Sequence, residues 1–92
     1  MSNTKQNDLM LFGADWCMPC KALKRSLEEI GMRNYLFIDV DNGYLHGQQF
    51  GIKTVPTMVI VNDKGEEVDR KTGALTSAKL TEWLLQHNVE IK

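Results

Sequence analysis

The stretch Ala14–Lys21, ADWCMPCK, decides how this chain is interpreted. It contains both cysteines of the chain, Cys17 and Cys20, with Trp16 directly before the first and Pro19 directly before the second. A C-x-x-C pair of this kind can supply two ligands of a metal site, form a small structural disulfide, or act as a dithiol that opens and closes. The surrounding sequence indicates which of these three uses fits best.

The metal and cross-link interpretations are each weakly supported. A structural zinc site takes four ligands, and the only histidines, His46 and His87, are too far apart in sequence to form a second ligand pair. A structural disulfide gains stability from the length of the loop that it closes, and this loop would be close to the minimum. We therefore expect no metal and favour a redox dithiol.

The redox interpretation explains where the cysteines stand. Cys17 follows a short apolar run, Leu9–Phe12, and precedes a segment with helical periodicity. The start of a helix has unpaired N–H groups and the positive end of the helix dipole, so the pKa of the Cys17 thiol should lie below that of a free thiol. Pro19 is tolerated in the first helical turn, and Cys20 lies one turn further in.

Apolar periodicity and turn signals predict an α/β fold. Strands are expected at 9–12, 35–40 and 57–61, and a polar strand at 66–72 follows the turn signal NDKG. One helix is expected from the cysteines to Gly31, and a short irregular helix within 41–51. A last helix should begin after Thr76 or Ser77, and its inner face should carry Leu80, Trp83, Leu84 and His87. The order is β-α-β, short helix, β-β-α, which gives a four-stranded mixed sheet of order 2-1-3-4 flanked by helices. Residues 1–7 are interpreted as a flexible arm and residues 8–92 as a single domain.

Composition excludes several classes of function. The chain has 92 residues and a formal net charge of −1, without a basic stripe, which argues against nucleic-acid binding. It has no apolar run of the roughly 18–20 residues that a membrane span needs. The first eight residues contain no hydrophobic leader, which favours a cytoplasmic location, where thiols are kept reduced.

Three motifs resemble the thioredoxin family. WCMPCK (16–21) is similar to the thioredoxin active site W-C-G-P-C-K, with Met18 in the position of the glycine. FGIKTVPT (50–57) resembles the thioredoxin segment that ends in I-P-T, and GAL (73–75) matches a third segment. The motifs occur in the family's order, and the resemblance covers nearly everything from Leu9 onward, so it implies a thioredoxin-like fold.

The resemblance also implies roles for individual residues. Cys17 would be the attacking thiolate, Cys20 the resolving thiol, and Pro56 a cis proline packed against the disulfide. The backbone of Val55 would pair with an extended substrate segment. The substrate-binding surface would comprise Trp16, Met18, Pro19, Val55, Pro56, Gly73 and Ala74. No cofactor is implied beyond the Cys17–Cys20 disulfide.

The implied partners are proteins with disulfide bonds and a reductase such as thioredoxin reductase, with glutathione as another possible electron donor. A monomer or a weak dimer is expected. Two alternatives stay open: a glutathione-dependent, glutaredoxin-like reductase, and a non-catalytic module that uses a thioredoxin-like surface to hold a partner. Glutaredoxins place proline directly after the first cysteine, which differs from this sequence.

Three features differ from the thioredoxin pattern. The chain lacks room for the strand and helix with which thioredoxins begin, so the strand at 35–40 should be a sheet edge covered by the N-terminal arm or by another chain. Leu11 and Phe37 stand where thioredoxins have a buried aspartate and its lysine, which leaves water, the departing thiol or Asp15 to take the Cys20 proton. Gly13 replaces a tryptophan, which predicts a less crowded site and a more flexible strand end.

Overall fold

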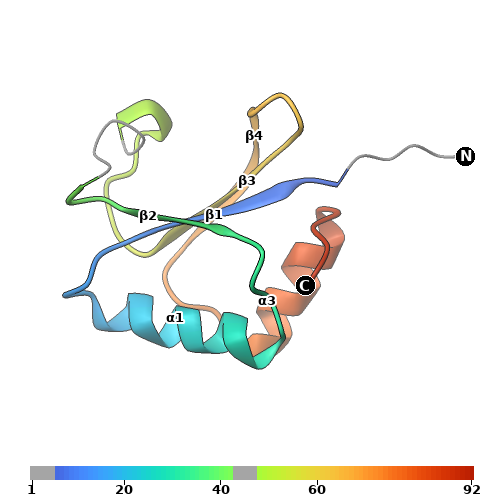
Figure 1. Cartoon of the computed structure of the whole chain (residues 1–92), viewed down its shortest axis with the longest axis horizontal. Coiled ribbons are helices and arrows are strands. Elements are labelled where there is room, and N and C mark those ends of the chain that lie inside the picture. Colours follow the sequence, from blue (N-terminus) through green and yellow to red (C-terminus); the bar gives the residue numbers. More distant parts are fainter. Residues whose placement is uncertain (1–5, 43–47) are drawn as a thin grey trace, which may run out of the picture.

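The computed structural model describes residues 6–42 and 48–92, and these form one mixed sheet with helices packed against it (Figure 1). The elements are β1 (Asp8–Gly13), α1 (Met18–Glu29), β2 (Leu36–Asp39), β3 (Thr57–Val61), β4 (Glu67–Thr72) and α3 (Ser77–Gln86). The sheet order β2-β1-β3-β4 confirms the prediction. Residues 48–50 are helical, as expected in part, whereas most of the predicted arm and residues 43–47, including His46, lie outside the described residues.

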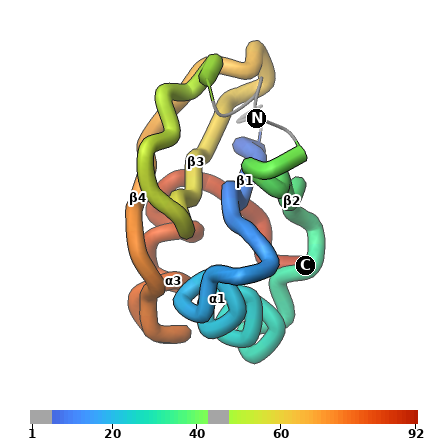
Figure 2. Tube along the Cα trace, turned by 90° about the vertical axis from the view of Figure 1, so that its left-hand side faces the viewer, coloured from blue at the N-terminus to red at the C-terminus, as the bar shows by residue number. Residues whose placement is uncertain are grey.

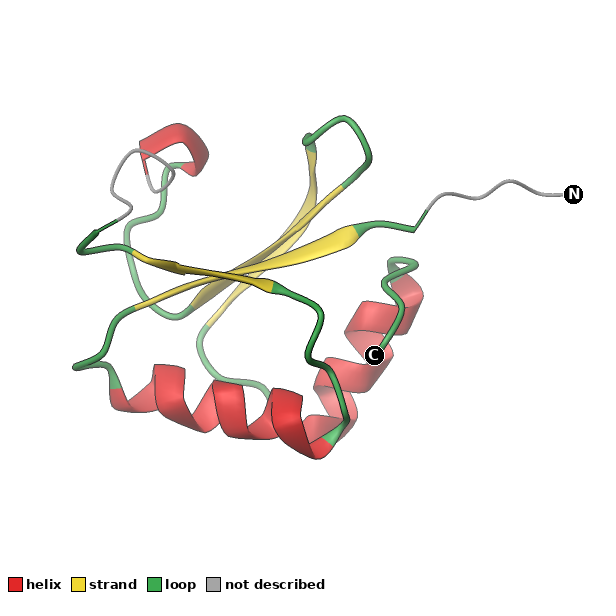
Figure 3. Cartoon of the chain, in the orientation of Figure 1, coloured by secondary structure: helices red, strands yellow, loops and turns green. Residues whose placement is uncertain are grey.

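The central strands are buried on both faces, which their continuous apolar sequences indicate. β1 pairs in parallel with β2 and antiparallel with β3, and every residue of β3 is buried. Helices α1 and α3 lie together on one side of the sheet (Figure 3). On the other side, Phe50 and Ile52 pack against the sheet.

Helix α1 ends and helix α3 begins where the sequence signals predict. However, α3 ends at Gln86, so His87, which the sequence predicts on the inner face of this helix, is the cap residue that follows it. Gly31 follows α1 with a positive φ of 80°, and the N–H of Met32 bonds back to the carbonyl of Leu27 at 2.8 Å, which ends the helix. Thr76 caps the start of α3 by accepting a hydrogen bond from the backbone N–H of Lys79 at 3.3 Å. These caps fix the carboxyl end of α1 and the start of α3.

Strand β2 is an edge of the sheet, with β1 on one side of it (Figure 2). Leu36, on this strand, is 55% exposed. The part of the N-terminal arm that the structure describes lies elsewhere, because Asn7 hydrogen-bonds to the carbonyls of His87 and Asn88. Cover from residues 1–5 or from another chain stays a prediction.

Leu11 and Phe37, the apolar replacements of an expected buried ion pair, are neighbours in the sheet. They are register partners on β1 and β2, and Leu11 is completely buried. The ammonium of Lys24 lies 3.6 Å from the centre of the Phe37 ring and covers its outer face. Because both members of the buried charged pair are replaced, no unpaired charge is left in the core.

Gly13, the last residue of β1, is in a tightly packed position. A Cβ atom there would lie 3.0 Å from Cε1 of Phe37 and 3.2 Å from Sγ of Cys20. The predicted loosening of the site is therefore not what the packing shows: the ring of Phe37 and the sulfur of Cys20 occupy the space that a side chain would need. The glycine is required by this close approach.

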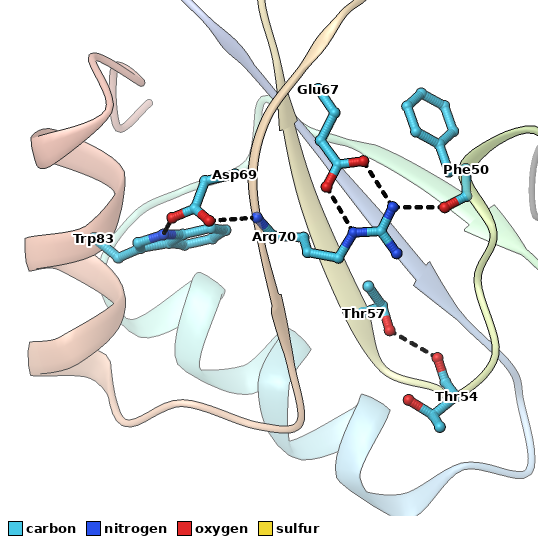
Figure 4. Close-up of polar contacts among 7 residues, drawn as sticks. All are labelled: Phe50, Thr54, Thr57, Glu67, Asp69, Arg70 and Trp83. Atoms are coloured by element: carbon cyan, nitrogen blue, oxygen red, sulfur yellow. Dashed lines mark hydrogen bonds and ion pairs between the residues drawn. The ribbon is translucent and has the colours of Figure 1, made fainter.

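The last strand is tied to the last helix by polar contacts (Figure 4). Asp69 on β4 accepts a hydrogen bond from the indole Nε1 of Trp83 at 2.9 Å, and Nε2 of His87 lies 2.9 Å from the same carboxylate oxygen. The hydrogen bond from Trp83 is the main reason that the pKa of Asp69 lies below its usual range, with smaller contributions from the N–H of Arg70 and from His87, while partial burial opposes them.

Substitution of Gly13 by alanine should destabilise the fold by about 1–3 kcal/mol, because the added methyl group overpacks the contact with Phe37 and Cys20. Urea denaturation measures the change. The double variant Gly13→Ala with Phe37→Leu should lose less stability than the sum of the two single changes. Strict additivity would contradict the packing described here.

Stability should fall in acid partly through Asp69. Its pKa is lower in the folded protein than in the unfolded chain, so its contribution is complete above the unfolded value and is lost as the pH falls through the folded value. The Asp69 side chain is 41% exposed, so the effect should stay below about 1 kcal/mol. Asp69→Asn, followed by urea denaturation between neutral and acidic pH, should flatten the pH dependence of stability, and an unchanged pH dependence would contradict this assignment.

Candidate active site

Cys17 occupies the cap position at the start of α1, as predicted. Its backbone is extended, with φ −90° and ψ 108°, and its sulfur accepts the backbone N–H of Cys20 at 3.2 Å. Its own N–H bonds to the carbonyl of Ala14 at 3.2 Å, which holds the turn between β1 and the helix. The helix therefore directs an N–H group and the positive end of its dipole at this sulfur.

Cys20 lies one turn into the helix and is bonded to Cys17 in a disulfide. The two Cα atoms are 5.2 Å apart. The residue exposures are 4% for Cys17 and 1% for Cys20, and together with Ala14 they form a small buried cluster that Val40 and Val55 cover. Both sulfurs are thus nearly buried at the carboxyl end of the parallel strands, and Cys20 lies deeper than Cys17.

The loop before β3 brings the second motif to the cysteines. The peptide bond between Val55 and Pro56 is cis, as the resemblance implies, and Pro56 is buried. The hydroxyl of Thr57 donates to the carbonyl of Thr54 at 2.7 Å and fixes this loop (Figure 4). The N–H of Gly73 donates to the carbonyl of Pro56 at 2.9 Å, which joins the third motif to the second.

The residues predicted to form a substrate-binding surface differ in exposure. Trp16 and Met18, on either side of Cys17, are 67% and 70% exposed, which is unusual for large apolar side chains. Pro19 and Ala74 are exposed, Val55 and Gly73 are half-buried, and Pro56 is buried. Contact between Pro56 and the disulfide, and the binding role of the whole set, remain predictions.

A pocket beside the disulfide includes residues that sequence reasoning missed. It has a volume of about 290 Å³ and is lined by Trp16, Val40, Ile52, Lys53, Thr54 and Val55. At its edge, the indole N–H of Trp16 donates to Asp41 at 3.0 Å. Val40 and Asp41 could have been suspected, because they follow the end of a strand parallel to β1, and sites in α/β sheets gather at that edge.

The part of the chain that the structure describes contains neither a metal-binding cluster nor a membrane-spanning helix. Within residues 6–42 and 48–92, no three or more His, Cys, Asp or Glu side chains come together in a way that could hold a metal ion. No helix in the same part of the chain is long and apolar enough to cross a membrane.

Comparisons with known proteins agree with the geometry. The sequence model of the thioredoxin family matches residues 1–86. The chain is 34% identical to the thioredoxin of Chlamydia muridarum over 83 residues, which is 86% of this chain and 80% of the relative. It is also 34% identical to the thioredoxin of Staphylococcus saprophyticus over 85 residues, which is 87% of this chain and 81% of the relative.

Solved structures give the same result. The structure of Malassezia sympodialis thioredoxin superimposes with a TM-score of 0.79 at 28% identity, covering 92% of this chain and 77% of that one. Fasciola hepatica thioredoxin gives a TM-score of 0.77 at 31% identity, covering 92% and 84%. With a paired dithiol at the start of a helix, the chain is a thiol–disulfide oxidoreductase and belongs to the thioredoxin family.

Proposed function

We propose that Cys17 is the nucleophile of a protein-disulfide reductase and that Cys20 is its resolving thiol. The observation that carries this assignment is the hydrogen bond from the N–H of Cys20 to the sulfur of Cys17 at the start of α1. That contact stabilises a negative charge on Cys17 and gives Cys20 no equivalent help. The asymmetry distinguishes the two otherwise similar thiols.

The reaction runs in two exchanges. The Cys17 thiolate attacks one sulfur of a substrate disulfide, the substrate bond breaks, and the other substrate sulfur leaves as a thiolate. Cys20 loses its proton and attacks the Cys17 sulfur of the resulting mixed disulfide. The Cys17–Cys20 disulfide forms, and the substrate is released in its reduced form, so the two electrons come from the dithiol and no further cofactor takes part.

The direction of the reaction should favour reduction of substrates. The residues between the cysteines, Met18 and Pro19, carry no charge, and a histidine there would stabilise the thiolate further and make the protein more oxidising. We expect a reduction potential closer to about −270 mV than to about −180 mV, the values of reductants and isomerases respectively. Such a reductant suits the cytoplasm, where the thiol pool keeps a dithiol reduced.

Substrates would dock on the apolar surface around Cys17. The exposed side chains of Trp16 and Met18 provide this surface on the helix side, and Val55 and Gly73 provide it on the side of the cis proline. An extended substrate segment could pair with the backbone of Val55 as an added strand. This arrangement suits unfolded or loop segments of disulfide-containing proteins better than a small anionic thiol.

The start of α3 argues against the glutathione-dependent alternative. An anionic carboxylate would be expected at such a helix start. However, the hydroxyl of Thr76 is used by the N–H of Lys79, and the hydroxyl of Ser77 donates to the carboxylate of Glu29 at 2.6 Å. A second carboxylate would meet the negative charge of Glu29, so we propose a reductase of the thioredoxin reductase type as the electron donor.

Cys17→Ser should reduce insulin disulfides no faster than the uncatalysed background, because the attacking thiolate is lost. The assay uses NADPH with thioredoxin reductase, beside a parallel assay with glutathione and glutathione reductase. Cys20→Ser should accumulate a mixed disulfide with the substrate, visible by mass spectrometry, because no thiol resolves it. Full biological activity of Cys17→Ser would instead favour a non-catalytic binding module, and faster turnover with glutathione would favour the glutaredoxin-like alternative.

In the reduced protein, the Cys17 thiol should ionise below the free-thiol pKa of about 8.5, because the N–H of Cys20 and the helix dipole stabilise its thiolate. The rate of alkylation by iodoacetamide as a function of pH measures this in the Cys20→Ser variant, where Cys17 is the sole thiol. Ionisation like that of a free cysteine would remove the physical basis of the assignment.

A further inference from the structure

The structure leaves the proton of the resolving thiol without a buried acceptor. Among the described residues, Thr57 is the one polar side chain that is buried, and its hydroxyl already donates to the carbonyl of Thr54. Leu11 and Phe37 fill the positions behind the cysteines with apolar atoms. A thiol that must ionise before it attacks therefore needs a base at the edge of this apolar region.

We propose that the carboxylate of Asp39, at the end of β2, accepts the proton of Cys20 through bridging water in the resolving step. This inference rests on the proposed dithiol cycle and adds a residue to it. The thiol proton of Cys20 passes to Asp39, and the Cys20 sulfur attacks the Cys17 sulfur. The bond from Cys17 to the substrate breaks, and the released substrate thiolate takes the proton back from Asp39.

The sheet register places Asp39 next to Cys20. Asp39 is the partner of Gly13 in the parallel β1–β2 pair, and the N–H of Val40 holds the strands together there by bonding to the carbonyl of Gly13 at 2.9 Å. Paired residues of neighbouring strands project to the same face and lie about 4.8 Å apart. Because Sγ of Cys20 is 3.2 Å from where a Gly13 Cβ would stand, Cβ of Asp39 lies within about 8 Å of that sulfur.

Because Gly13 has no side chain, Cys20 can lie close to the end of β2, where Asp39 stands. Cys20 and the edge of the Phe37 ring meet in the space over Gly13. Asp39 stands two residues beyond Phe37 on the same face, where the strand ends and its side chain is half-buried. Solvent therefore reaches the carboxylate, and water can bridge the remaining distance to the sulfur.

Other ionisable groups near this end of the sheet fit the role less well. They are Asp15 in the loop before α1, Lys21 and Lys24 on α1, Asp41 after β2, and Lys53 before the cis proline. The lysines are cations at neutral pH and favour the thiolate without taking its proton. Asp41, beyond the end of β2, and Asp15, in the loop before α1, are both exposed. Neither belongs to the register that pairs Asp39 with Gly13. Asp15, one of the acceptors expected from the sequence, is therefore the weaker candidate.

Asp39 also has a structural role, which the test must distinguish from its proposed role as a base. Its Oδ1 accepts the backbone N–H of Asp41 at 2.9 Å and closes the turn after β2. Asp39→Asn keeps an oxygen for that N–H but cannot take up a proton in this pH range. Asp39→Glu keeps a carboxylate but displaces it from the turn. The two variants therefore separate loss of the base from loss of the turn contact.

The test follows the reduced protein after mixing with one equivalent of the chromogenic aryl disulfide DTNB. The first release of aryl thiolate reports attack by Cys17, and the second reports attack by Cys20 on the mixed disulfide. In Asp39→Asn the first phase should be unchanged and the second should slow by about 100-fold or more at neutral pH, the lower end of the range for loss of a general base. The deficit should disappear at alkaline pH, where hydroxide removes the proton, and Asp39→Glu should recover most of the rate.

Asp15→Asn is the matched control, and it should keep a second phase within about 2-fold of the wild-type rate. An unchanged second phase in Asp39→Asn, or an equal slowing in Asp15→Asn, overturns the inference. A slowing of Asp39→Asn that persists at alkaline pH, or that accompanies loss of thermal stability and is not recovered by Asp39→Glu, assigns Asp39 a structural role and also overturns it. Absence of the first phase in the wild-type protein would refute the proposed dithiol function itself.

Discussion

The chemistry of this protein depends on the hydrogen bond between the backbone N–H of Cys20 and the sulfur of Cys17. It exists because Cys17 caps a helix whose first N–H groups have no carbonyl partner within the helix. The same short segment thus provides the second thiol, the donor that stabilises the first, and the geometry that lets the two sulfurs bond. The rest of the fold holds this helix end at the carboxyl edge of the sheet.

The support behind the cysteines is apolar and closely packed. Leu11 and Phe37 are neighbours across the β1–β2 pair, and Gly13 lets the ring of Phe37 and the sulfur of Cys20 approach each other. Such a core costs no desolvation of buried charge, whereas an ion pair in the same place would. In the proposed cycle, ionisation of Cys20 is therefore assisted from the sheet edge, by Asp39 at the end of β2.

The surface around Cys17 is assembled from three separate parts of the chain. The exposed Trp16 and Met18 come from the start of α1, Val55 from the loop before β3, and Gly73 from the end of β4. The pocket beside Trp16 adds Val40, from the loop after β2, and Lys53, from the same loop as Val55. Large apolar side chains exposed together next to a reactive disulfide are suited to bind apolar segments of a partner protein.

The sequence by itself determined the strands, the helices and the two reactive residues through local signals, and the order of the strands followed from the order of the elements along the chain and the right-handed parallel connection. Alternating or continuous apolar runs define the strands, and Gly31 and Thr76 define helix ends through backbone geometry. The C-x-P-C spacing requires a helix start. The tertiary structure alone decided how Gly13, Phe37 and Asp39 come together around Cys20, and that Asp41 holds Trp16. Most of those contacts join residues more than 15 positions apart, and their closeness depends on strand register and side-chain packing, which no local pattern encodes.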